Sequence, residues 1–292
     1  MAIRLVVTDM DNTLYSWIDY IVPAVEAMVD AVVKATGFPR IKVVQSLKAV
    51  YTKYESNEYP FALQESSLFQ DFPEFGSFDK LVIEPARMAF SEARRKYLRP
   101  YKGVVETLAA LKERHVFVVA LTDAPRNPAE QRARRMGLDQ HLTALYTMPG
   151  FQFPRTAEGE ALVAPDILHK EEKGDYRAAC PVFELPREWE KPNPSGLQKI
   201  LGTYGLSPKE VLVVGDSLKK DVAIARELGC HDCWAEYGTY VSLEYRERLD
   251  IISSTAITRR HAASVFETGP QAKPSHTLSN YGRLLELVDA LA

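Results

Sequence analysis

Short apolar runs alternate with amphipathic helical patterns along most of the chain. The runs predict strands at 4–8, 116–121, 145–148, 211–214 and 232–235. Between them, apolar residues at helical spacing predict helices over 103–115, 127–136, 194–204 and 219–228. Nearly continuous apolar strands are typical of a parallel sheet covered on both faces. The pattern therefore predicts an α/β fold with a Rossmann-like, doubly wound parallel sheet.

Residues 16–99 interrupt this alternation directly after the first strand. Helical spacing of apolar residues predicts helices over 21–36, 41–54 and 78–97. We therefore expect a core formed by residues 1–15 and 100–292, with a helical domain formed by residues 16–99. Residues 149–187 and 238–274 follow no regular pattern and are expected to be irregular insertions in the core.

Composition narrows the choice of protein class. A chain of 292 residues with 46% hydrophobic content can bury one large core and a smaller attached domain. The formal net charge of −3 gives no sign of a nucleic-acid partner. No apolar run reaches about 18 residues, so no membrane span is expected. Three cysteines make no disulfide framework and the start of the chain does not resemble a signal peptide, so a cytoplasmic protein is expected. A basic stretch of the helix predicted over 127–136 is expected to be a solvated face, formed by Arg132, Arg134 and Arg135.

The first strand ends in Asp9-Met10-Asp11-Asn12-Thr13. Functional groups of open α/β sheets lie beyond the carboxyl ends of the strands. The Asp9 carboxylate can attack phosphorus to give an aspartyl-phosphate, and Asp11 can protonate the leaving oxygen and later activate water. The alternative is a pair of acidic residues that merely cap a helix.

Two further polar residues follow other predicted elements. Thr122 ends the run at 116–121, where its hydroxyl could donate to a phosphate oxygen or cap the next helix. Lys191 lies between Glu190 and Pro192, just before a predicted helix, where it could place a positive charge on phosphate. The alternative for Lys191 is an ordinary surface lysine.

The run at 211–214 is followed by Gly215-Asp216-Ser217 and then by Asp221. Mg²⁺ prefers oxygen ligands, and Asp9 and Asp216 could supply them from separate strand ends. A carboxylate about 4 Å from a phosphate dianion is opposed by roughly 8 kcal/mol at an effective dielectric of about 20. Lys191 and Mg²⁺ together could offset that repulsion.

Taken in order, the four motifs resemble the haloacid dehalogenase-like hydrolase superfamily, in particular its phosphatase branch. The resemblance covers about residues 1–15, 100–148 and 188–238. It implies that Asp9 is the nucleophile and Asp11 the general acid/base, and that Thr122 and Lys191 bind phosphate.

The resemblance also implies a metal site and a cap. The Asp9 carboxylate, the Asp11 backbone carbonyl and Asp216 would hold Mg²⁺, with Asp221 as a supporting acid. Residues 16–99 would form a type 1 helical cap that closes over the site and selects the substrate. Asp123 departs from the family pattern because it adds a negative charge beside Thr122.

The expected function is therefore that of a Mg²⁺-dependent phosphatase, a phosphoric monoester hydrolase. Its substrate would be a small phosphorylated metabolite, either a nucleotide or another phosphoester. Candidate substrate contacts in the cap are Trp17, Tyr20, Tyr51 and Tyr54, although aromatic residues at helical spacing more often belong to a core. A phosphomutase and a catalytically silent phosphate-binding module remain alternatives. A 2-haloacid dehalogenase is disfavoured because it has no use for Asp11 as acid/base.

Overall fold

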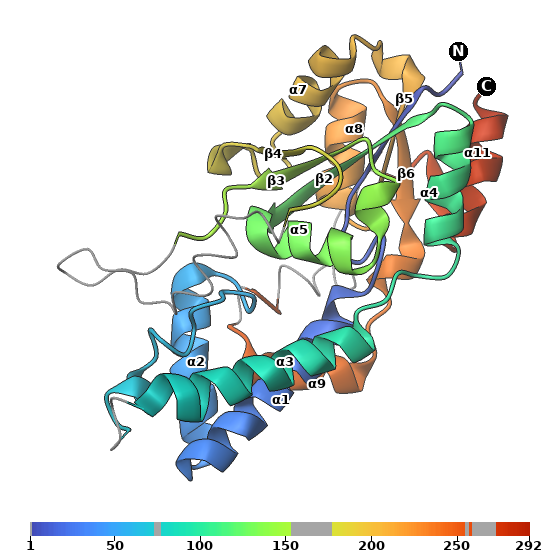
Figure 1. The fold of residues 1–292 in the computed structure, drawn as a ribbon. Coiled ribbons are helices and arrows are strands. Elements are labelled where there is room, and N and C mark those ends of the chain that lie inside the picture. The colour runs from blue at the N-terminus through green and yellow to red at the C-terminus, as the bar shows by residue number, and fades with distance from the viewer. Residues whose placement is uncertain (1, 73–76, 153–176, 255–256, 259–272) are drawn as a thin grey trace.

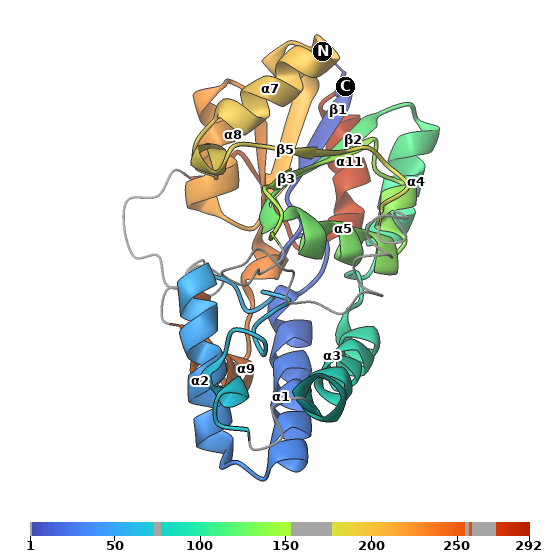
Figure 2. The same ribbon diagram turned by 60° about the vertical axis from the view of Figure 1, so that its left-hand side comes forward.

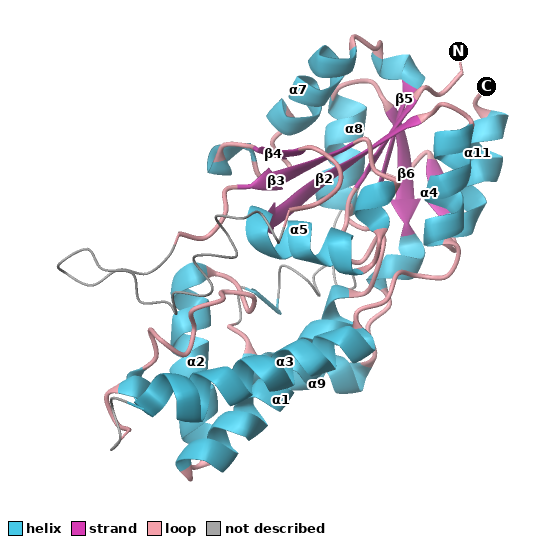
Figure 3. Ribbon diagram, in the orientation of Figure 1, coloured by secondary structure: helices cyan, strands magenta, loops and turns pink. Residues whose placement is uncertain are grey.

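A seven-stranded parallel sheet forms the centre of the molecule (Figure 3). The computed structural model describes residues 2–72, 77–152, 177–254, 257–258 and 273–292. The strands are β1 (Leu5–Thr8), β2 (Phe117–Pro125), β3 (Ala144–Met148), β4 (Val182–Glu184), β5 (Val211–Gly215), β6 (His231–Ala235) and β7 (His276–Leu278). They lie in the order β4-β3-β2-β1-β5-β6-β7, and every neighbouring pair is parallel. The predicted parallel α/β fold is confirmed.

Helices cover both faces of the sheet (Figures 1 and 2). The core helices are α4 (Val104–Glu113), α5 (Arg126–Arg135), α7 (Ser195–Tyr204), α8 (Ala223–Glu227) and α11 (Leu284–Ala290). Successive strand residues point to opposite faces, so Val6 joins the core layer that contains α4, α5 and α11. Val7 joins the other layer, which contains α7 and α8.

Strand β1 lies in the middle of the sheet, where the strand order changes direction. Thr8 at its end is level with Ala120 of β2 and Val214 of β5. The residues that follow these three strands therefore meet at one edge. This is the switch point at which ligands bind in doubly wound folds.

Three helices of the expected cap lie beyond that edge (Figures 1 and 2). They are α1 (Trp17–Thr36), α2 (Arg40–Tyr54) and α3 (Glu84–Tyr97), the last preceded by a π-helical turn (Asp79–Ile83). Helix α1 begins where Ser16 Oγ accepts the Asp19 N–H at 3.2 Å, and it ends at Gly37 in the left-handed region with φ 71°. The predicted helical cap inserted after the first strand is confirmed. No helix in the described residues is long and apolar enough to cross a membrane.

The expectation that 149–187 and 238–274 are irregular was wrong for part of each segment. Strand β4 lies in the first and helix α9 (Leu243–Ile252) in the second. Both have a weak sequence signal, because β4 has three residues and α9 buries only Leu249 and Ile252. Residues 153–176, 255–256 and 259–272 of these segments lie outside the described residues.

Helix α9 packs against the cap, although it follows β6 of the core. Arg248 forms an ion pair with Glu26 of α1 at 2.6 Å, and Lys48 of α2 donates to the Asp250 carbonyl at 2.8 Å. The Asn57 side chain donates to the Ile252 carbonyl at 3.3 Å and accepts the Ser253 hydroxyl at 2.6 Å. The second segment therefore adds a fourth helix to the cap and holds the chain that follows α2.

This packing predicts unequal effects for two adjacent isoleucines. Ile252 is 3% exposed and Ile251 is 59% exposed. Ile252→Ala should lower the free energy of unfolding by about 2–4 kcal/mol, because it empties a buried site. Ile251→Ala is the matched control and should change it by less than about 0.5 kcal/mol. Equal midpoints of denaturant unfolding for the two variants would contradict the packing of α9.

Candidate active site

Lys191 joins the first and last motifs of the site. Its ammonium lies 2.7 Å from Asp9 Oδ1 and 2.7 Å from Asp221 Oδ1, and it donates to the Leu121 carbonyl at 3.2 Å. The Lys191 side chain is 4% exposed. The interpretation of Lys191 as a surface lysine is therefore wrong, and its charge is committed to carboxylates from two separate strand ends.

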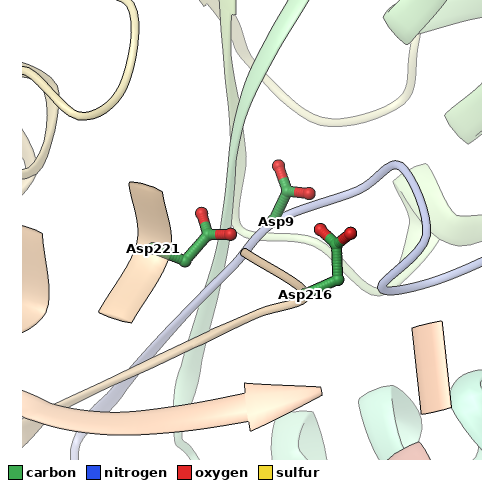
Figure 4. A group of neighbouring side chains, drawn as sticks. All are labelled: Asp9, Asp216 and Asp221. Atoms are coloured by element: carbon green, nitrogen blue, oxygen red, sulfur yellow. The ribbon is translucent and has the colours of Figure 1, made fainter. Parts of the chain in front are cut away.

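Three carboxylates gather around this ammonium. Ligand oxygens of Asp9, Asp216 and Asp221 all lie within 4.8 Å of one another (Figure 4). Asp9 follows β1, Asp216 follows β5, and Asp221 lies in the π-helical turn after β5 (Leu218–Val222). Within the described residues, no donor reaches the Asp216 carboxylate or Asp9 Oδ2.

The crowding of negative charge changes the acidity of these groups. Burial raises the pKa of the Asp9 carboxyl to about 7; Lys191 lowers it and Asp221 raises it further. Burial raises the pKa of Asp216 well above its usual value, and the charges of Asp9 and Asp221 add to the effect. Burial alone would lower the pKa of Lys191, but Asp221 and Asp9 hold it well above its usual value. Lys191 therefore stays protonated.

Two glycines permit this close packing. A Cβ on Gly215 would lie 2.1 Å from Asp221 Cγ, and a Cβ on Gly238 would lie 1.6 Å from the Asn12 carbonyl oxygen. Asn12 has a left-handed φ of 56°, and its side chain accepts the Trp17 N–H at 3.1 Å. The backbone after β1 thus turns sharply toward α1, which leaves Asp9 and Asp11 at the edge of the sheet.

The donor set fits a hard divalent cation. When all three carboxyls are ionised, the single ammonium leaves two negative charges uncompensated, and the Asp216 carboxylate lacks a donor in the described part of the chain. Carboxylate oxygens are the ligands that Mg²⁺ prefers. Of the three, Asp221 is the most occupied, because its oxygens already accept from Lys191 and from the Ser217 N–H at 3.2 Å.

Thr122 and Asp123 lie in β2, near its end. The Thr122 hydroxyl accepts the Ala124 N–H at 3.2 Å, while α5 begins after Pro125. The alternative that Thr122 caps this helix is therefore wrong, and within the described residues its hydroxyl donates to no partner. Asp123 accepts the Lys191 N–H at 3.0 Å and pairs with Lys220 at 2.7 Å. Burial opposes its ionisation, but Lys191 and Lys220 hold its pKa below the usual value.

Arg132 is a site residue that the sequence did not reveal. The expectation that it lies on a solvated helix face was wrong: its side chain is 1% exposed. Its Nη2 donates to Asp11 Oδ2 at 3.3 Å, and its Nη1 pairs with Glu58, in the loop after α2. The spacing of apolar residues on α5 does not reveal that Arg132 is buried. Arg132 belongs to a basic stretch in which its neighbours Arg134 and Arg135 are exposed.

A cavity of about 370 Å³ separates the sheet edge from the cap. Its walls include Asp9, Asp11, Thr122, Lys191, Asp216 and Asp221, together with Trp17, Tyr54 and the loop after α2. Of the four aromatic candidates, Trp17 and Tyr54 line it, whereas the buried Tyr20 and Tyr51 do not. Four separate segments of the chain thus bring every expected catalytic, phosphate and metal residue to one cavity.

Comparison with known proteins gives the family. The family model described as haloacid dehalogenase-like hydrolase matches residues 3–152, and one described as HAD-hydrolase-like matches residues 188–257. The chain is 25% identical over 169 residues to a glyceraldehyde 3-phosphate phosphatase of Pyrococcus furiosus, covering 56% of this chain and 55% of that one. It is 24% identical over 241 residues to a phosphoglycolate phosphatase of Aliivibrio fischeri, covering 81% and 85%. The first alignment thus spans about half of its relative's length.

Solved structures give the same fold. A 2-haloacid dehalogenase from Pseudomonas syringae matches 99% of this chain and 100% of its own with a TM-score of 0.56 at 17% identity. At this low identity, the likeness establishes the fold alone. The expected class of phosphoric monoester hydrolase agrees with the phosphatase relatives. With a family match over half of its length, the chain belongs to the haloacid dehalogenase-like hydrolase family.

Proposed function

We propose that this protein is a Mg²⁺-dependent phosphatase that hydrolyses a small phosphomonoester through an aspartyl-phosphate on Asp9. The observation that carries the proposal is the cluster of Asp9, Asp216 and Asp221 around the Lys191 ammonium, at the switch point of the sheet. The Lys191 ammonium donates to Asp9 Oδ1, and no donor in the described residues reaches Asp9 Oδ2. Oδ2 is thus the oxygen placed to attack.

The chain's own residues account for both halves of the reaction. Asp9 Oδ2 attacks phosphorus, the ester oxygen leaves with a proton from Asp11, and an acyl phosphate forms on Asp9. Asp11 then takes a proton from water, which attacks phosphorus and releases inorganic phosphate and the free Asp9 carboxylate. Lys191 and the Thr122 hydroxyl would bind the phosphoryl oxygens.

Asp9, Asp216 and the Asp11 backbone carbonyl would hold Mg²⁺, with Asp221 as a supporting acid. When bound, the ion would screen the carboxylate nucleophile from phosphate and stabilise negative charge in the transition state. The unmatched charge of the buried acidic cluster supports this assignment. A cation there would also favour the ionised, nucleophilic form of Asp9, whose pKa burial raises to about 7.

The cavity supports a small substrate. Its volume of about 370 Å³ is near the lower end of the range for small-molecule sites. The phosphatase relatives act on phosphoglycolate and glyceraldehyde 3-phosphate, which are small phosphorylated metabolites. A small phosphorylated metabolite is therefore the proposed substrate class.

We also propose how the chain divides into domains. The core would comprise residues 1–15 and 100–292, and the cap residues 16–99, with α9 as a core segment that packs into the cap. The ion pair between Arg248 and Glu26 and the hydrogen bonds of Asn57 support the packing of α9 against the cap.

The nucleophile can be tested by one substitution. Asp9→Asn should lower turnover of phosphate monoesters by at least about 10³-fold, because an amide is a poor nucleophile toward phosphorus. The exposed Asp19→Asn is the matched control and should keep wild-type turnover. Wild-type turnover by a folded Asp9→Asn protein would exclude the mechanism.

Metal dependence gives a second test. Chelation should abolish turnover and Mg²⁺ should restore it, because the acidic cluster carries uncompensated charge. Asp216→Ala should raise the Mg²⁺ concentration for half-maximal activity by at least about tenfold. Asp250→Ala, on the exposed side of α9, should leave it unchanged. Full activity after exhaustive chelation would contradict the metal site.

The aromatic residues of the cap give a third test. Tyr54→Leu should change the KM for the preferred metabolite more than the turnover of a small generic phosphoester, because contacts to the remote part of a substrate are separable from phosphoryl chemistry. Tyr97→Leu on α3 is the control, since Tyr97 does not line the cavity. If Tyr54→Leu slows all substrates by one factor, Tyr54 does not select the substrate.

A further inference from the structure

Behind the cavity, a buried cluster of polar side chains surrounds Arg132. Its guanidinium donates from Nε to the Tyr15 hydroxyl at 2.7 Å and from Nη1 to the Tyr20 hydroxyl at 3.2 Å. It also forms ion pairs with Asp11 and with Glu58. Arg132, Tyr15 and Tyr20 do not line the cavity, whereas Asp11 and Glu58 do. Within the described residues, Arg132 therefore reaches the cavity through these two carboxylates.

Both oxygens of Asp11 are held from behind the cavity. The Tyr15 hydroxyl donates to Oδ1 at 2.5 Å, and Arg132 Nη2 donates to Oδ2 at 3.3 Å. Tyr15 is fully buried in the connection from β1 to α1, so its ring cannot change position without repacking the core. These two donors fix the direction in which the Asp11 carboxylate faces the cavity.

Glu58 fixes Arg132 in turn. Its carboxylate accepts from Arg132 Nη1 and the Tyr20 hydroxyl, and from Trp17 Nε1 at 2.9 Å. Arg132 belongs to α5 of the core, whereas Glu58 belongs to the cap loop that Asn57 ties to the end of α9. One guanidinium thus joins the core, the chain after β1 and the substrate-facing loop of the cap.

We propose that Arg132 is the positioning residue for Asp11, and that Glu58 of the cap loop holds its guanidinium in the productive orientation. The planar fork of an arginine suits this role, because it can contact two carboxylates and two hydroxyls in a fixed geometry. The inference rests on the proposed function, since it assumes that Asp11 transfers a proton to the leaving oxygen. The orientation of the Asp11 carboxyl would thus depend on the contact between Arg132 of the core and Glu58 of the cap.

The test uses the dependence of rate on the leaving group. A poor leaving group, such as the alcohol of an alkyl phosphate, needs the acid, whereas the phenol of 4-nitrophenyl phosphate departs without much help. Arg132→Lys in the full-length chain with Mg²⁺ should lower kcat for the alkyl phosphate about 10²-fold and for 4-nitrophenyl phosphate less than about threefold. KM should change little for either substrate, because Arg132 does not reach the cavity.

Two conservative variants keep the test independent of folding. Tyr15→Phe and Glu58→Gln preserve volume and should produce the same selective loss, about tenfold on the alkyl phosphate. Arg134→Lys, on the exposed side of α5, is the matched control and should behave as wild type. The double variant Arg132→Lys/Glu58→Gln should lose less than the product of the two single losses, because both act through one contact.

The outcomes separate the two proposals. If folded Arg132→Lys, Tyr15→Phe and Glu58→Gln proteins slow both substrates by the same factor, the positioning role is wrong while the phosphatase mechanism stands. If the wild-type protein with Mg²⁺ hydrolyses neither substrate, nor any other phosphate monoester, the proposed function fails and the positioning role fails with it.

Discussion

The repulsion among three carboxylates at the centre of the sheet is the constraint on which the site depends. At 4.8 Å, two such charges repel by at least about 3 kcal/mol at an effective dielectric of about 20. Each contact of 2.7 Å to Lys191 contributes roughly 6 kcal/mol of attraction at the same dielectric. One lysine can therefore offset much of the repulsion of Asp9, Asp216 and Asp221, while two negative charges remain unmatched when all three are ionised. The same excess of negative charge that opposes folding makes the cluster a suitable cation site.

Charge is balanced locally around the rest of the cavity. Asp123 is paired with Lys220 at 2.7 Å and accepts the Lys191 backbone N–H at 3.0 Å. Arg132 similarly lies between Asp11 and Glu58. Burial raises the pKa of the Asp11 carboxyl; Arg132 opposes this rise, whereas Glu58 adds to it. Although the formal net charge is only −3, the basic side chains named here lie directly beside the buried acidic ones.

The cap is held to the core by more than the two connections at its ends. Helix α9 returns from the core and pairs with α1 through Arg248 and Glu26. Phe151, which follows β3, packs edge-on against Tyr59 with ring centroids 5.2 Å apart. Both segments that the sequence left without regular structure therefore touch the cap. Tyr59 also stacks on Tyr54 of the cavity wall at 3.6 Å, so these contacts reach the residues that face a substrate.

Five of the described strands, β1, β2, β3, β5 and β6, and the acidic motifs could be predicted from the sequence because their signals are local. Buried strands such as β1 and β5 are continuous apolar runs, and the acids that follow them stand at strand ends whatever the rest of the chain does. The order of these motifs along the chain was enough to predict that Asp9, Asp11, Lys191 and Asp216 lie together. The helical spacing of apolar residues likewise predicted the cap helices, such as α1.

The tertiary structure decided what depends on contacts between distant residues. Arg132 and Arg134 look alike in the sequence, yet the first is buried and the second exposed, because only the first meets Asp11 and Glu58 across the interface of core and cap. Tyr51 and Tyr54 share one helix, but the direction of its packing puts one in the core and the other in the cavity wall. The sequence by itself determined which residues could do the chemistry. The partners that hold them followed from the packing of separate elements, since a buried charge is paired with neighbours that lie up to 182 positions away.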